Sequence, residues 1–398
     1  MREILSKLLD RDLETLNIIH KEGQITKKNL QVKTGMTLTT LNRVMKSLED
    51  KKLIMEAGIS ESTGGRKAVE YGTAQTGAYV IGVDISRTYV KIIIVNLRMI
   101  ILKEEKFYMD DSFSPEKTVD KITDLIEQKL LELSISKNEV LGIGVGTVGP
   151  LDRKRGIMIS PKNFFNKSWS NVAIKEMIEK KISIPCFIDN GANTAVLAEY
   201  LFGKGKDLKS IVYIHCGIGI RSAVINDGII IRTMNDSEDA FAHMIVDSNG
   251  ERCICGNKGC IESYSSIDAM IKRYNLRTKN NNNNNANEEV REEEYKKVLD
   301  LAMRNDEFAT EIVDKGAENL GIGLANLVRI LNPQLVILCG PLIKNYKRYY
   351  DMCINTFHKI NYLNNAVVFS KGGGFKEDAI AIGASLMVIE KYIRKDRD

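Results

Sequence analysis

Hydrophobic positions in the first 57 residues follow helical spacing only. Leucine and isoleucine recur every three or four residues between residues 5 and 19, which predicts a first amphipathic helix. A short helix over 28–33 follows, and Thr37 is placed to cap a third helix that runs to about Lys52. We interpret Leu38 and Leu41 of this third helix as packing residues. Two short strands around a glycine-rich segment complete the region, so the pattern predicts a winged helix-turn-helix.

From Tyr79 onward the pattern changes to apolar strands alternating with helices. Strands are expected at 79–86 and 90–97, with a tight turn at Ser86-Arg87, and then at 141–149 and 186–189. Helices are expected at 115–134 and from near Asn193. A second set of similar order has strands at 211–217, 222–226 and 335–340, and a closing helix starts at about Ala379. Two such sets predict two α/β lobes with a cleft between them.

These patterns divide the chain into three predicted domains. Residues 1–75 form the winged helix-turn-helix, 76–200 the first lobe, and 201–378 the second lobe; the closing helix, about 379–398, is expected to return to the first lobe. Asn280–Asn285 is a run of six asparagines that cannot bury apolar area. We interpret this run as a flexible loop without a function.

Composition is ordinary for a globular protein, with 43% hydrophobic and 27% charged residues. No apolar run approaches 18 residues and the start of the chain is charged, so we expect neither a transmembrane span nor a signal peptide, and a cytoplasmic location. The net charge of +5 is too small to identify a nucleic-acid-binding protein by itself.

Three of the seven cysteines crowd into eight residues. Cys253, Cys255 and Cys260, together with His243, supply three thiolates and one imidazole, a closed tetrahedral set suited to structural Zn²⁺. In a reducing compartment such cysteines are free thiols or metal ligands. The alternative is three buried thiols beside a core histidine. Because four protein ligands leave no open position, the predicted zinc is structural and not catalytic.

Four segments carry a family resemblance over nearly the whole chain: IGVDISRT at 81–88, GVGTVGPLD at 144–152, IDNGANTAVLAE at 188–199 and HMIVDSNGERCICGNKGCIE at 243–262. They resemble the ROK family (repressors, open reading frames and kinases), which has the actin-like ATPase fold. The resemblance implies the zinc motif position for position. A winged helix before the ROK portion is the arrangement of the family's sugar-responsive transcriptional repressors, the xylose repressors among them.

The resemblance also shows where the kinase machinery is altered. ROK kinases carry their catalytic base in an N-D-A-N segment, and the matching base position here is Gly191, which cannot accept a proton. Asp189, two residues earlier, is expected to point elsewhere. The two phosphate motifs carry Ser86-Arg87 and Ile218 where kinases have glycine or threonine, and Arg221 replaces another glycine. We therefore expect no catalytic residue, no use of ATP and no enzyme activity.

The sugar pocket of the family is partly kept. The resemblance assigns sugar binding to Asn163, Asn190, His243 and Glu262, whose amides and carboxylate suit the hydroxyls of a polyol. Ala240 replaces a further glutamate of the family. The expected effector is a sugar or a sugar phosphate, and the alternative is a vestigial pocket that binds nothing.

The third helix offers a polar surface to double-stranded operator DNA. Base edges and phosphates in a major groove would meet a set of short polar and basic side chains: Thr37, Thr39, Thr40, Asn42, Arg43 and Lys46. Arg66 at the tip of the wing would reach a minor groove or a phosphate. The alternative for this module is contact with another protein.

Taken together, the sequence predicts a sugar-responsive DNA-binding transcriptional regulator that represses carbohydrate-utilisation genes. Adequate specificity in a genome normally needs two half-sites, so a homodimer on a pseudo-palindromic operator is expected, with no membrane partner. The alternative from the enzyme class is an ATP-dependent ROK sugar kinase with an appended DNA-binding domain. A third reading is a DNA-binding protein that responds to no ligand.

Overall fold

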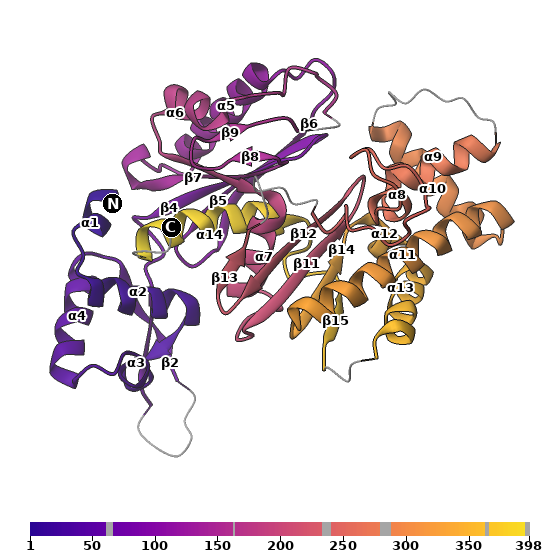
Figure 1. The fold of residues 1–398 in the computed structure, drawn as a ribbon. Coiled ribbons are helices and arrows are strands. Elements are labelled where there is room, and N and C mark those ends of the chain that lie inside the picture. Colours follow the sequence, from indigo (N-terminus) through magenta and orange to yellow (C-terminus); the bar gives the residue numbers. More distant parts are fainter. Residues whose placement is uncertain (61–66, 162–163, 233–239, 279–287, 363–365, 395–398) are drawn as a thin grey trace.

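The computed structural model describes residues 1–60, 67–161, 164–232, 240–278, 288–362 and 366–394. Arg66, Asn163 and the run Asn280–Asn285, which carry three of the expectations above, lie outside the described residues. A small N-terminal domain lies beside two larger α/β lobes, and the last helix returns from the second lobe to the first (Figure 1).

The N-terminal domain is the expected winged helix-turn-helix. It contains α1 (Arg2–Ser6), α2 (Asp10–Glu22), α3 (Lys27–Thr34) and α4 (Leu38–Asp50), with the strands β1 (Ile25–Thr26), β2 (Ile54–Ile59) and β3 (Val69–Thr73). The strand order is β1-β3-β2, and all pairs are antiparallel. The strands β2 and β3 form the wing.

Two expectations for this domain are wrong. The first amphipathic helix is interrupted: Leu9 is extended and 56% exposed, and its N–H donates to the carboxylate of Asp12, so that α2 begins as a new, capped helix. Leu38 is also not a packing residue, because it is 53% exposed, whereas Leu41 is fully buried. Both errors have the same cause: the helical spacing assigned Leu9 and Leu38 to an apolar face, but the fold exposes both side chains to solvent.

Lobe 1 is a five-stranded mixed sheet in the order β10-β7-β4-β5-β6. Its strands are β4 (Tyr79–Ile85), β5 (Tyr89–Asn96), β6 (Ile101–Tyr108), β7 (Val140–Thr147) and β10 (Cys186–Asn190), and a short ribbon is formed by β8 (Leu151–Asp152) and β9 (Ile157–Met158). One face is covered by α5 (Pro115–Glu132) and α6 (Ile174–Ile182), and the other by α7 (Gly191–Leu201) and α14 (Ala379–Ile393). The edge strand β6 escaped the sequence analysis because charged residues interrupt its apolar positions.

Glycines let α14 lie directly on the sheet of lobe 1. A Cβ atom at Gly82 would be 2.0 Å from the carbonyl oxygen of Ala381, and one at Gly144 would be 1.9 Å from that of Ala384. No side chain fits at either place, so the helix backbone rests on the strands. This contact fixes the C-terminal helix against lobe 1.

Lobe 2 is a second five-stranded sheet, in the order β13-β12-β11-β14-β15. Its strands are β11 (Ser210–Cys216), β12 (Ile220–Asn226), β13 (Ile229–Ile231), β14 (Leu335–Cys339) and β15 (Val368–Lys371). Its helices are α8 (Glu262–Ser265), α9 (Ile267–Thr278), α10 (Glu288–Met303), α11 (Glu307–Leu331), α12 (Pro341–Asn345) and α13 (Lys347–Ile360). In both lobes an antiparallel hairpin pairs with a parallel strand, as the two similar strand sets predicted.

The hydrophobic core of the N-terminal domain continues into the lobes. Leu16 of α2, Val95 of β5 and Ile393 of α14 belong to one buried cluster. The winged helix is therefore packed on the lobes and not only tethered to them. The predicted domain boundaries after residues 75 and 200 remain predictions. Within the described part of the chain, no helix is both long and apolar enough to cross a membrane.

Candidate functional site

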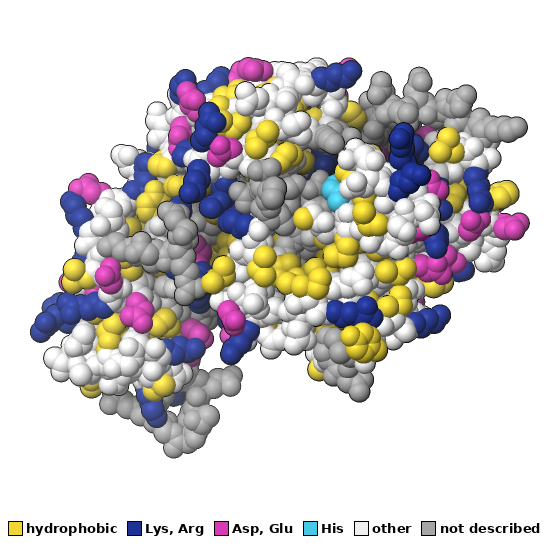
Figure 2. Space-filling model, in the orientation of Figure 1, with side chains coloured by type: hydrophobic (Ala, Val, Ile, Leu, Met, Phe, Trp, Pro, Cys, Tyr) yellow, Lys and Arg dark blue, Asp and Glu magenta, His cyan; other side chains and the backbone are white. Residues whose placement is uncertain are grey.

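The outward face of α4 is polar and basic. Thr39, Asn42, Arg43 and Lys46 are exposed, while Leu41, Val44 and Leu48 of the same helix are buried against the rest of the domain. The alternation follows the helical period, so the apolar stripe holds the helix in place and leaves the polar stripe free. Figure 2 shows Lys and Arg side chains gathered on the side of the N-terminal domain where α4 lies.

Thr37 is the exposed N-cap of α4, and its side chain bonds the half-buried Thr40. The Thr37 hydroxyl accepts a hydrogen bond from the N–H of Thr40 (3.3 Å) and donates one to the Thr40 hydroxyl (3.0 Å). These contacts fix the first turn of α4, as the sequence predicted for Thr37. The first turn is also the part of such a helix that meets base edges in proteins of this class.

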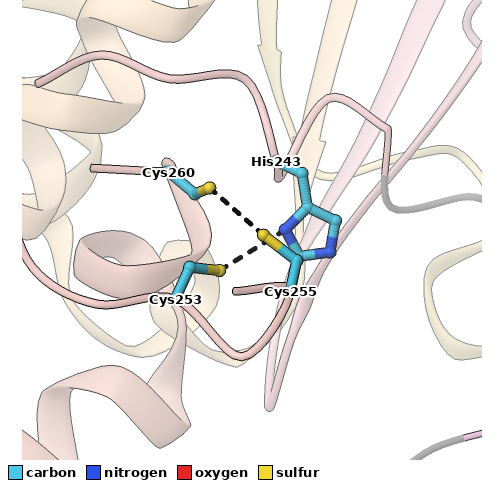
Figure 3. Close-up of side chains that lie close together, drawn as sticks. All are labelled: His243, Cys253, Cys255 and Cys260. Carbon is cyan, nitrogen blue, oxygen red and sulfur yellow. Dashed lines mark hydrogen bonds between the residues drawn. The ribbon is translucent and has the colours of Figure 1, made fainter. Parts of the chain in front are cut away.

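The four predicted metal ligands lie together. His243, Cys253, Cys255 and Cys260 each offer one ligand atom, and these atoms all lie within 4.8 Å of one another. Their side chains point toward a common centre (Figure 3). The Cys255 and Cys260 sulfurs are 3.6 Å apart, far beyond a disulfide bond, and the Cys253 sulfur lies 3.5 Å from Nδ1 of His243. This group could hold a metal ion.

Glycines and backbone hydrogen bonds shape the segment around these ligands. Gly256 and Gly259 have positive φ values of 98° and 72°, and a Cβ atom at Gly259 would be 1.5 Å from the carbonyl oxygen of Asp247. The Cys253 N–H donates to the Asn257 carbonyl, which closes the turn. Burial raises the pKa of Cys260 to about 12, so without a metal this thiol keeps its proton.

Two of the predicted sugar-binding residues are neighbours in lobe 2. The Glu262 N–H donates to the carbonyl of Ala242 (2.8 Å), which places Glu262 beside His243. One carboxylate oxygen of Glu262 accepts a hydrogen bond from the N–H of Ile220 (2.8 Å), the first residue of β12 after the turn that leads from β11. Glu262 therefore also supports the turn that corresponds to the second phosphate motif.

Asn190 lies in lobe 1, at the end of β10, where it caps α7. Its side-chain oxygen accepts hydrogen bonds from the N–H groups of Ala192 (2.9 Å) and Asn193 (3.3 Å). The next residue, Gly191, is the one that the sequence resemblance matches to the catalytic base of ROK kinases. A Cβ atom there would be 3.3 Å from Ile380 of α14 and 3.6 Å from the carbonyl oxygen of Thr147, so little space is left for a side chain at this position.

Sequence reasoning missed the partner of Asp189. The carboxylate of Asp189 is buried and forms a two-pronged ion pair with Arg232, with Nη2–Oδ2 and Nη1–Oδ1 distances of 2.8 and 3.1 Å. Arg232 follows β13 of lobe 2, whereas Asp189 belongs to β10 of lobe 1. No sequence signal connects the two residues, because only the fold brings these strand ends together.

The two turns that match the phosphate motifs carry charged side chains. Asp84 at the end of β4 is buried and accepts a hydrogen bond from the Tyr89 hydroxyl (2.9 Å). Burial raises the pKa of Asp84 to about 6, although the hydrogen bond and the charge of Arg221 oppose the shift. Burial, followed by the charges of Arg221 and Arg87, lowers the pKa of His215 to about 3. The charges of Arg87 in lobe 1 and Arg221 in lobe 2 therefore both act on these turns.

The fold and these residues define a class: a winged-helix DNA-binding domain joined to an actin-like, two-lobed kinase fold. A winged helix-turn-helix DNA-binding profile matches residues 8–55, and the ROK family profile matches residues 80–391. The chain belongs to the ROK family.

Similar proteins include regulators and kinases. The xylose repressor of Bacillus spizizenii is 29% identical over 385 residues, which cover 95% of this chain and 94% of that protein. A solved ROK family transcriptional regulator, described as a homologue of the Escherichia coli MLC protein, has a TM-score of 0.76 at 21% identity and covers 96% of this chain and 97% of its own. A ROK hexokinase from Thermus thermophilus has a TM-score of 0.66 at 22% identity, covering 79% of this chain and 98% of its own.

Proposed function

We propose that this protein is a sugar-responsive transcriptional repressor of carbohydrate-utilisation genes. The observation that carries the proposal is the combination in one chain of an exposed polar and basic α4 face with a ROK portion whose base position is Gly191. The similarity to a xylose repressor along almost the full length of both proteins supports this function. It also makes D-xylose the first effector to test.

In this proposal, α4 reads the major groove of operator DNA. Thr39, Asn42 and Arg43 reach base edges or phosphates, and Lys46 lies one turn further along the same face. Thr37 and Thr40 bring hydroxyl groups to the first turn. Because one winged helix covers about one half-site, two chains act together as a homodimer on a pseudo-palindromic operator.

The effector site lies between the lobes, where the predicted sugar ligands Asn190, His243 and Glu262 belong. Catalysis is absent from this proposal because the base position holds no side chain and Ile380 restricts the space beside it. The hydroxyl of a bound sugar then meets no group that can take its proton. The ROK portion acts as a sensor and uses no ATP.

Zinc fits the His243 and cysteine group by ligand type, and two of the separations between ligand atoms are close to those around a tetrahedral zinc ion. Tetrahedral zinc with typical bond lengths separates two sulfurs by about 3.8 Å and a sulfur and a nitrogen by about 3.6 Å. The structure has 3.6 Å between the sulfurs of Cys255 and Cys260 and 3.5 Å between Cys253 and His243. In this proposal zinc is structural and cross-links the segment that ends at Glu262.

One experiment tests the repressor against the kinase. Purified protein selects its operator from a pool of random DNA duplexes, and a gel-shift titration then measures operator affinity with D-xylose and a panel of other sugars and sugar phosphates. A coupled assay measures ATP turnover with the same compounds. We expect one compound to change operator affinity and none to be phosphorylated. Turnover by the wild-type protein would establish the kinase, and failure to select any DNA would reject the regulator.

A further inference from the structure

The ion pair of Asp189 and Arg232 ties lobe 2 to the first turn of α7. Besides both contacts to Arg232, Asp189 Oδ1 accepts hydrogen bonds from the Asn190 N–H (2.8 Å) and from the Asn193 side-chain amide (3.1 Å). The side chain of Asp189 is 4% exposed and that of Arg232 is 30% exposed. A buried carboxylate that loses its cationic partner is strongly destabilised. Any movement of lobe 2 at this point therefore acts on the start of α7.

The helices α7 and α14 form one closely packed unit. A Cβ atom at Gly383 of α14 would be only 1.7 Å from the carbonyl oxygen of Thr194 in α7, so the two backbones are in direct contact. The fully buried carboxylate of Glu199 in α7 accepts hydrogen bonds from the N–H groups of Gly374 and Phe375, which lead toward α14. Such contacts leave little room for α7 to bend or slide independently.

The other end of α7 touches the DNA-binding domain. Phe202, the C-cap residue that follows α7, lies edge-to-face against His20 of α2, with 5.2 Å between ring centroids. His20 is buried, and its Nδ1 lies 2.9 Å from the carbonyl oxygen of Leu97 in lobe 1. The Thr73 hydroxyl, at the end of the wing, donates to the same carbonyl oxygen (3.2 Å). Figure 1 shows α7 between the two sheets and α2 facing lobe 1.

Resting on the proposed function, we infer that α7 is the element that transmits effector binding to the DNA-binding domain. Movement of lobe 2 acts on α7 through the Asp189–Arg232 pair, and α7 acts on α2 through the contact of Phe202 with His20. An effector that shifts lobe 2 relative to lobe 1 moves Arg232 and with it the first turn of α7. Eleven helical residues span about 16 Å as a stiff rod, so this displacement reaches α2. Arg232 and Phe202 are positioning residues that contact neither DNA nor, in this scheme, the effector.

The first test needs no effector and no DNA. Amide hydrogen exchange of α2 is compared in the wild type, in Arg232→Gln and in Arg348→Gln. Arg348 forms a similar two-pronged pair with Asp314, but within lobe 2, and is the matched control. We expect Arg232→Gln to speed exchange in α2 several-fold, Arg232→Lys to have a smaller effect, and Arg348→Gln to have none. Unchanged α2 exchange in folded Arg232→Gln would overturn the inference.

The second variant locates the route. In the Phe202→Leu background, which keeps an apolar side chain but removes the ring edge from His20, Arg232→Gln should no longer alter α2 exchange. An unaltered response in this background would assign the coupling to another contact, such as that between α14 and α2, and would also overturn the inference.

The third measurement connects the route with regulation. With the sugar that regulates the wild type, beginning with D-xylose, operator Kd is measured with and without sugar. We expect Phe202→Leu to bind DNA and sugar as the wild type does, while the ratio of the two operator Kd values falls toward 1. A full ratio in Phe202→Leu would overturn the inference. A wild type that responds to no sugar would instead reject the proposed function, and the exchange experiment would still decide whether α7 couples the two ends.

Discussion

The buried His20, which lies where the DNA-binding domain packs on the lobes, should make the stability of the folded protein decrease at acidic pH. Its Nδ1 faces the Leu97 carbonyl oxygen, so the ring nitrogen that carries hydrogen is Nδ1, and Nε2 is buried with no hydrogen-bond partner among the residues that the structure describes. Burial lowers the pKa of His20 from 6.5 to about 4, although the charge of Glu390 opposes the shift. Between pH 6.5 and about 4, His20 therefore stays neutral in the folded protein but is protonated in the unfolded chain.

The size and sign of the effect follow from this difference. A pKa of about 4 in the folded protein in place of 6.5 in the unfolded chain corresponds to about 3 kcal/mol of unfolding free energy. Because the folded-state pKa is the lower one, this stability is fully present above pH 6.5 and is lost as the pH falls from 6.5 to about 4. His215 acts in the same direction, whereas Asp84, with its raised pKa, acts in the opposite direction between pH 6 and 3.8.

The assay isolates His20 by comparison with His20→Asn, whose amide can still donate to Leu97 but cannot take up a proton. Equilibrium urea unfolding is measured for both proteins at several pH values from 7.5 to 4.5. The other titrating groups and the metal site are common to both proteins, so their contributions cancel in the difference. We expect the wild type to lose up to about 3 kcal/mol relative to the variant on acidification. A difference in unfolding free energy that does not change with pH would refute the buried, neutral state of His20.

Four further predictions concern the remaining sites. Purified protein should contain about one zinc per chain, and Cys255→Ser should lose the metal, measured by elemental analysis, together with much of its thermal stability; full stability without zinc would contradict a structural role. Arg43→Ala should weaken operator binding in a gel shift while sugar binding is unchanged, and Arg155→Ala, an exposed control in lobe 1, should bind normally. Gly191→Asp should show no ATP turnover in a coupled assay, because a base without a well-placed nucleotide gains little, and its melting temperature should fall because the site is confined. Glu262→Ala should lose the sugar response in a gel shift yet bind operator without sugar, and a normal response would show that the pocket has been misplaced.

Local patterns in the sequence were sufficient for the elements whose signals are local. Thr37 was identified as a cap because an N-cap bonds the backbone of its own helix only three residues away. Cys253, Cys255 and Cys260 were identified as a group because they lie within eight residues, with His243 a short distance before them as a fourth ligand, and the family motif agreed with this set. Gly191 was identified by counting along a motif. The edge strand β6 was missed because charged residues interrupt its apolar positions, and β13 was missed because its apolar run is only three isoleucines long.

Contacts between distant segments were decided by the tertiary structure alone. Asp189 and Arg232 are 43 residues apart, and each simply follows a short apolar strand in the sequence. Nothing near His20 indicates burial against Phe202, and nothing near Gly191 indicates that Ile380 restricts its space. Periodicity reports which face of an element is apolar, but not which element covers it. The winged helix and the metal group thus follow from the sequence, whereas the route from the lobes to the DNA-binding domain exists only because the chain returns through α14 and packs α7 between two sheets.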